Sequence, residues 1–149
     1  MLAAAVEWSP AQRPVPRTRL VASHTGRMRE AFVHTAVLHM IVGADERVPG
    51  AAITTALCGD LEHEPPCPVS AHHTASTRNG DTVRLRVLFA AEPADEARVR
   101  ADIDAALVAG EWLGPDGVVT HWRLLDSSPA EIAGSDAERA ERLRRDRKV

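Results

Sequence analysis

The stretch HHTASTRNGDTVRLRVLFA, residues 72–90, decides the fold that the sequence predicts. Its Asn79-Gly80 pair is a strong signal for a tight turn between two β-strands. After the turn, apolar and polar side chains alternate, so one face carries Val83, Leu85, Val87 and Phe89 and the other carries Arg84 and Arg86. The stretch therefore predicts a β-hairpin of residues 72–78 and 82–90, with one face of its second strand in a core.

The segments before the hairpin predict a strand and then a short helix. Residues 32–42, FVHTAVLHMIV, are apolar and β-branched with little interruption, as in a strand that is covered on at least one face. Pro49 and Gly50 open a helical segment that ends before Gly59, because Pro is favoured in the first helical turn and Gly just after the last. The β-branched residues 53–55 also suit a strand, so the first helix is the weakest element of this prediction.

The segments after the hairpin predict a second helix and a last strand. Pro93 marks the start of the helix and Gly110 its end, and Val99, Ile103 and Leu107 have the spacing of a buried stripe. Residues 118–125 alternate and predict the strand, with Val118, Trp122 and Leu124 on one face. Ser127-Ser128-Pro129 has the composition of a turn.

The order strand, helix, strand, strand, helix, strand is that of a ferredoxin-like split βαβ fold. We therefore expect an α+β protein, with an antiparallel sheet and two helices on one of its faces. We expect residues 32–133 to form a single domain that carries the Cys/His loop of residues 58–73. Residues 1–31, interrupted by three prolines and five arginines, predict a disordered extension, and residues 134–149 predict a charged helical or frayed tail.

Both cysteines and three of the seven histidines fall within sixteen residues. The residues are Cys58, His63, Cys67, His72 and His73, in the spacing C-x4-H-x3-C-x4-H-H. Thiolate and imidazole are the ligands that zinc prefers, and four of them close a tetrahedral site. We therefore expect a Cys2His2-type structural zinc site, made by Cys58, His63, Cys67 and one of the two adjacent histidines.

Other interpretations of this loop stay open. The alternating order of Cys and His differs from the usual zinc-finger spacing. An open site with a bound water would be catalytic, with Glu62 or Glu64 as the base. Cys58 alone also suits a small buried side chain, and a Cys58–Cys67 disulfide is a further alternative, which a reducing cytoplasm disfavours.

The charge distribution excludes some classes of partner. Residues 32–133 carry seven Arg and fifteen Asp or Glu, so the body is acidic and disfavours nucleic-acid binding. No apolar run has the length of a membrane span, and the first residues lack the order of a secretory signal, so we expect a cytoplasmic protein. Seventeen of the eighteen basic residues are Arg, which indicates a high-GC bacterial genome.

The sheet face opposite the two helices is a second candidate site. Alternation places basic and imidazole side chains there that can bind a small anionic ligand: His39, Arg84, Arg86, His121 and Arg123, with His34 in place of His39 if the first strand has the other register. The strand 32–42 is apolar on both of its faces, so we also expect a homodimer that covers this open face. The sequence has no phosphate loop, nucleophile turn or dinucleotide motif, and it leaves open whether the protein is an enzyme.

Overall fold

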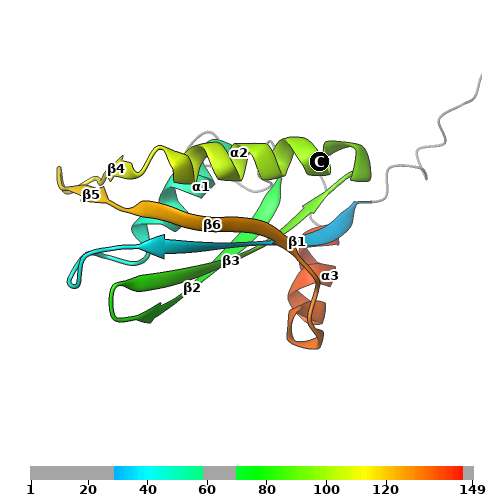
Figure 1. Cartoon of the computed structure of the whole chain (residues 1–149). Coiled ribbons are helices and arrows are strands. Elements are labelled where there is room, and N and C mark those ends of the chain that lie inside the picture. Colours follow the sequence, from blue (N-terminus) through cyan, green and yellow to red (C-terminus); the bar gives the residue numbers. More distant parts are fainter. Residues whose placement is uncertain (1–28, 59–69, 146–149) are drawn as a thin grey trace, which may run out of the picture.

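The computed structural model describes residues 29–58 and 70–145. These residues form a mixed α+β structure with a four-stranded antiparallel sheet, a two-stranded sheet and three α-helices (Figure 1). The elements in chain order are β1 (Glu30–His39), α1 (Val48–Cys58), β2 (Ala71–Asn79), β3 (Thr82–Ala91), α2 (Glu96–Val108), β4 (Glu111–Leu113), β5 (Val119–His121), β6 (Arg123–Ala130) and α3 (Ala137–Arg145).

The hairpin predicted from residues 72–90 is confirmed. Strands β2 and β3 pair antiparallel, and Asn79 lies opposite Thr82 across the turn. Gly80 has a φ of +63°, a left-handed conformation that Gly adopts without strain. Val83, Leu85, Val87 and Phe89 are all buried, so the predicted inward face of β3 is the core face.

The four long strands lie in the order β2-β3-β1-β6. Helices α1 and α2 pack side by side on one face, with α1 beside β2 and α2 beside β6 (Figure 1). Both helices predicted from the sequence are confirmed, and the expected stripe of Val99, Ile103 and Leu107 on α2 is fully buried. One continuous core fills the space between this helical layer and the sheet.

The last strand of the sheet differs from the prediction. Residues 118–125 do not form one strand: Val119–His121 pairs with Glu111–Leu113 in a separate small hairpin, and the sheet strand is Arg123–Ala130. The chain breaks at Trp122, whose backbone N–H donates to the Gly110 carbonyl and whose indole Nε1 donates to the Leu107 carbonyl at 2.8 Å. Trp122 is buried as expected, but it caps the end of α2 rather than continuing a strand.

The turn predicted at Ser127-Ser128-Pro129 is also wrong, because these residues lie within β6. Strand β6 is at the edge of the sheet. Pro has no backbone N–H to donate, and an edge strand tolerates this because only one of its sides pairs with another strand. Its register against β1 shifts at Val37 and Leu38, as in a β-bulge, and this leaves Leu125 half exposed.

Helix α3 packs on the sheet face opposite α1 and α2 (Figure 1). Ala140 is buried against Val33 and Leu88, and Leu143 packs beside them. The charged C-terminal segment is therefore a docked helix over residues 137–145, whereas its composition indicated a solvated end. This contact covers part of the apolar surface from which we expected a homodimer.

The predicted disordered extension lies mostly outside the described residues, and its last two positions, Glu30 and Ala31, already belong to β1. The described residues contain no helix with the length and apolar character of a membrane span.

Candidate functional site

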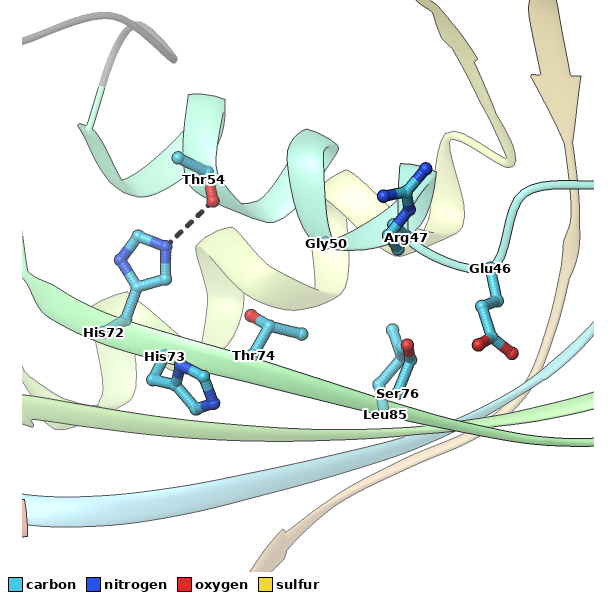
Figure 2. A pocket seen from close by; sticks show the side chains of 9 residues that line it. All are labelled: Glu46, Arg47, Gly50, Thr54, His72, His73, Thr74, Ser76 and Leu85. Atoms are coloured by element: carbon cyan, nitrogen blue, oxygen red, sulfur yellow. Dashed lines mark hydrogen bonds between the residues drawn. The ribbon is translucent and has the colours of Figure 1, made fainter. Parts of the chain in front are cut away.

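Two of the predicted metal ligands meet where α1 ends and β2 begins. Cys58 is the last residue of α1 and is buried, and its Sγ lies 3.7 Å from Nδ1 of His72. The other ring nitrogen of His72, Nε2, lies 3.0 Å from Oγ1 of Thr54, one helical turn before Cys58 (Figure 2). Nδ1 also lies 3.1 Å from the Ser70 carbonyl. Contacts on both sides of the ring thus fix its orientation.

His73 is separated from this pair by the alternation of the strand. It lies opposite Leu88 of β3, on the sheet face that carries α3, whereas His72 lies opposite Phe89 on the face of α1. Burial and the positive charge of Arg139 lower the pKa of His73 below its usual value. One imidazole of the two, that of His72, therefore faces Cys58.

The other two predicted ligands, His63 and Cys67, lie outside the described residues. Within residues 29–58 and 70–145, no cluster of three or more His, Cys, Asp or Glu side chains is arranged to hold a metal ion. The described part of the predicted site is thus the pair Cys58 and His72.

The five residues predicted to bind an anion do not form one group. His39, Arg84 and Arg123 lie on the sheet face opposite α1 and α2, with Arg84 paired to Val37 on one side of β1 and Arg123 paired to His39 on the other. His39 bonds to the Asp81 carboxylate at 3.1 Å. Arg86 lies on the same face, paired to Thr35 of β1, and His121 lies outside the four-stranded sheet.

Arg86 is held by the turn that precedes α3. Its guanidinium donates to Asp136 Oδ2 at 2.5 Å and to the Glu131 carbonyl at 3.0 Å. The hydrogen bond from Arg86 lowers the pKa of the Asp136 carboxyl. His121 lies on β5, outside the four-stranded sheet, with its Nδ1 3.5 Å from Glu111. The predicted set therefore divides into four side chains on the face, of which Arg84 and Arg123 are exposed while His39 bonds to Asp81 and Arg86 to Asp136, and one His on the small hairpin.

A polar cluster under α2, centred on the buried His34, was not predicted from the sequence. His34 of β1 is 2% exposed, and its Nε2 lies 2.7 Å from Ser127 Oγ and 3.2 Å from Asp104 Oδ1. The Ser127 hydroxyl donates to the same Asp104 oxygen. Arg100 Nη1 lies 3.1 Å from His34 Nδ1 and donates to the Val33 carbonyl at 2.8 Å.

These contacts define the protonation of His34. Arg100 can only donate, so Nδ1 of His34 accepts and Nε2 carries the proton, which it donates toward Ser127. Burial lowers the pKa of His34; the nearby Arg100 charge acts in the same direction, and Asp104 acts against it. The imidazole therefore has no free lone pair directed at Ser127, and the arrangement is a structural network instead of an activated serine.

The sequence carried a partial signal for this cluster. Glu96, Arg100 and Asp104 recur every four residues on α2, which predicts one polar stripe along the helix beside its buried stripe. Arg100 bonds to Glu96 at 2.8 Å along this stripe. Which side chains of β1 and β6 meet the stripe depends on strand register.

A pocket of about 300 Å³ between α1 and the edge strand β2 was likewise not predicted (Figure 2). Glu46, Gly50, Thr74 and Ser76 are among the residues that line it. Glu46 Oε2 and Thr74 Oγ1 are buried, and neither atom has a hydrogen-bond partner among the described residues. Unsatisfied buried polar atoms cost stability and are rare in folded proteins.

Comparison of the chain with models of known protein families and with curated proteins finds no match.

Proposed function

We propose that this is a small cytoplasmic zinc-binding protein, with a closed structural site made by Cys58, His63, Cys67 and His72. The observation that carries the proposal is the distance of 3.7 Å between Cys58 Sγ and His72 Nδ1. Cys58 is the last residue of α1 and His72 is the second residue of β2, and these two elements flank the segment that contains His63 and Cys67. A metal held by all four side chains would pin that segment to the domain.

The distance fits two ligands of one zinc ion. Zinc binds sulfur at about 2.3 Å and imidazole nitrogen at about 2.0–2.1 Å, and at the tetrahedral angle these bonds place sulfur and nitrogen about 3.6 Å apart. Cys58 and His72 already have this separation. Little movement of α1 or β2 is then required on binding, which lowers the cost of assembling the site.

The surroundings of His72 suit a metal ligand. In the structure Nδ1 faces the Ser70 carbonyl, an acceptor, and therefore carries the ring proton. Zinc on Nδ1 would replace that hydrogen bond, and the proton would reside on Nε2 and be donated to Thr54 Oγ1, which can accept as well as donate. A hydrogen bond on the second ring nitrogen is the usual support of a metal-bound His. The position of His73 on the opposite face favours His72 as the fourth ligand.

We further propose that the fold is the ferredoxin-like split βαβ fold. The strand order β2-β3-β1-β6, with every neighbouring pair antiparallel, supports this assignment, as do the crossover helices α1 and α2 on one face. In such a fold the proposed site stands at the end of the first crossover, between α1 and β2. A metal there stabilises the long connection inside that crossover.

Metal content per chain tests the proposal. The full chain is purified without a His tag, and zinc is measured by plasma mass spectrometry in the wild type and in Cys58→Ser, Cys67→Ser, His72→Asn and His73→Asn. We expect about one zinc per chain in the wild type and in the matched control His73→Asn, and loss of zinc in the other three. Absence of zinc from reduced wild-type protein would overturn the proposal.

Cobalt substitution separates a folded site from nonspecific binding. Co²⁺ in a site with two thiolates gives intense charge-transfer absorption, and we expect that absorption in the wild type and in His73→Asn but a weaker band in Cys58→Ser. Equal spectra for the wild type and Cys58→Ser would exclude Cys58 as a ligand. A metal-free module that binds an anion on Arg84 and Arg123 would instead tolerate both cysteine variants.

A further inference from the structure

We infer that the pocket between α1 and β2 binds a small primary amine, with Glu46 as the partner of its ammonium group. The inference does not depend on zinc, because the residues that carry it lie along the pocket away from Cys58. Figure 2 shows the pocket between helix α1 and strand β2, with Glu46 at one end and His72 at the other.

The charge of the pocket favours a cation. Glu46 is half-buried, and no ion pair from the described residues reaches its carboxylate. The adjacent Arg47 is 84% exposed and is engaged by Asp45, to which it donates through Nε at 3.1 Å and Nη2 at 3.0 Å. Arg47 also lines the pocket and its charge interacts with Glu46, but its hydrogen bonds go to Asp45. Asp45, Glu46 and Arg47 together carry one net negative charge, which a bound ammonium would balance.

The unsatisfied atoms favour a ligand with several hydrogen-bond donors. A carboxylate oxygen accepts only, and a Thr hydroxyl both accepts and donates. A primary ammonium offers three N–H groups, so it can bond to Glu46 and to a neighbouring hydroxyl at once. Rotation of the Glu46 or Thr74 side chain turns Oε2 or Oγ1 toward the pocket, and the bonds formed there recover the cost of the buried unpaired atom.

The shape of the pocket sets the size of the ligand. A volume of about 300 Å³ is at the lower limit of small-molecule sites. Thr74 and Ser76 lie two residues apart on the same face of β2, roughly 7 Å along the strand. An amine with a short aliphatic chain fits this length, with the chain against Gly50 and Leu85, which also line the pocket.

The experiment is an NMR titration of the full chain with three probes of equal length: n-butylamine, n-butanol and butanoate. We expect n-butylamine to shift the backbone amides of Gly50, Thr74 and Ser76 with a dissociation constant in the millimolar range, the range for so few atoms. The alcohol and the carboxylate bind at least about fivefold more weakly, because neither supplies a positive charge. Equal affinity for butanoate, or shifts that spare these amides, would overturn the inference.

Three variants locate the contacts. Glu46→Gln keeps the shape and removes the charge, and we expect it to weaken n-butylamine at least about fivefold, whereas the control Glu138→Gln on α3 has no effect. Thr74→Val removes the unpaired hydroxyl and weakens the amine while leaving the protein folded. Gly50→Val narrows the pocket and weakens all three probes. Unchanged affinity in Glu46→Gln would rule out this site for the amine, and zinc content would be unaffected in either case.

Discussion

The polar side chains under helix α2 and those beside helix α1 differ in how completely they are hydrogen-bonded. Under α2, the side chains of His34, Asp104, Ser127 and Arg100 all bond to one another or to the backbone. Under α1, Glu46 Oε2 and Thr74 Oγ1 are buried without a partner, and a pocket opens beside them. Completed polar contacts stabilise a fold, whereas unsatisfied ones reduce its stability and mark the side that is open to a ligand.

This contrast predicts the largest loss of stability at Arg100. The side chain of Arg100 is 14% exposed, donates to the Val33 carbonyl and to His34, and lies 5.3 Å from the ring centroid of Phe89. We expect Arg100→Met to lower the free energy of unfolding by about 3 kcal/mol, because it leaves these acceptors buried and unpaired. Denaturant unfolding measures this change.

The matched control is Arg98→Met, two residues earlier on α2, where the side chain is exposed. We expect a change within about 0.5 kcal/mol there, as for most surface substitutions. Equal losses in the two variants would show that the network under α2 adds nothing beyond ordinary helix packing.

The same network predicts a dependence of stability on pH. Burial lowers the pKa of His34 in the folded state below its usual value, so between the unfolded and the folded pKa the unfolded chain binds the extra proton. Stability therefore decreases as the pH falls from about 6.5 toward the lower folded pKa, and it is independent of His34 at higher pH. The groups that face the ring are Arg100, Asp104 and Ser127.

Unfolding midpoints at a series of pH values test this sign. We expect His34→Gln to be less stable at neutral pH and to lose less stability on acidification than the wild type. The burial of His73 acts in the same direction and remains in both proteins. A pH slope that is identical in the variant and the wild type would contradict the assignment of a neutral His34.

The sequence predicted the elements of the fold better than it predicted the contacts between them. The turn at Asn79-Gly80 and the alternation of β3 are local properties, and both are confirmed. The break at Trp122 depends on bonds to Gly110 and Leu107, which the alternation of residues 118–125 cannot reveal. The docking of α3 rests on Ala140 and Leu143. Two apolar residues are too few for the sequence pattern to predict a packed helix in so highly charged a segment.

The same limit applies to the candidate sites. Spacing alone selected Cys58 and the adjacent pair His72 and His73 as candidate ligands, because candidate metal ligands gathered in a short segment are visible in a sequence, and the structure brings Cys58 and His72 together. The meeting of His34 with Asp104 joins residues seventy positions apart, and it depends on the register of β1 and the rotation of α2. The alternation of β2 separates His73 from His72, and that part of the geometry could be read from the sequence once the strand was known.

Two threonines that both line the pocket give a smaller but direct test of the comparison. Thr54 Oγ1 bonds to His72, whereas Thr74 Oγ1 has no partner among the described residues. We expect Thr54→Val to lower the free energy of unfolding by about 1 kcal/mol and Thr74→Val to raise it by about 1 kcal/mol, because the second change removes an unsatisfied buried group. Both are measured in the absence of added metal and amine. Destabilisation by both variants would mean that the Thr74 hydroxyl is satisfied in solution.

The smallest effect is expected at Gly50, in the first turn of α1. A Cβ atom there would lie 3.5 Å from Thr74 Cγ2, an ordinary van der Waals contact, so Ala fits without displacing the strand. Ala is also the better helix former, and we expect Gly50→Ala to raise the free energy of unfolding by about 0.5 kcal/mol, less than in a helix interior because the position is close to the helix start. The added methyl group occupies part of the pocket, so the same variant should weaken n-butylamine slightly. A variant that is more stable to unfolding and also binds n-butylamine more weakly would identify the space as a binding pocket. If the space were only a packing defect, filling it would change the stability and leave the affinity for n-butylamine unchanged.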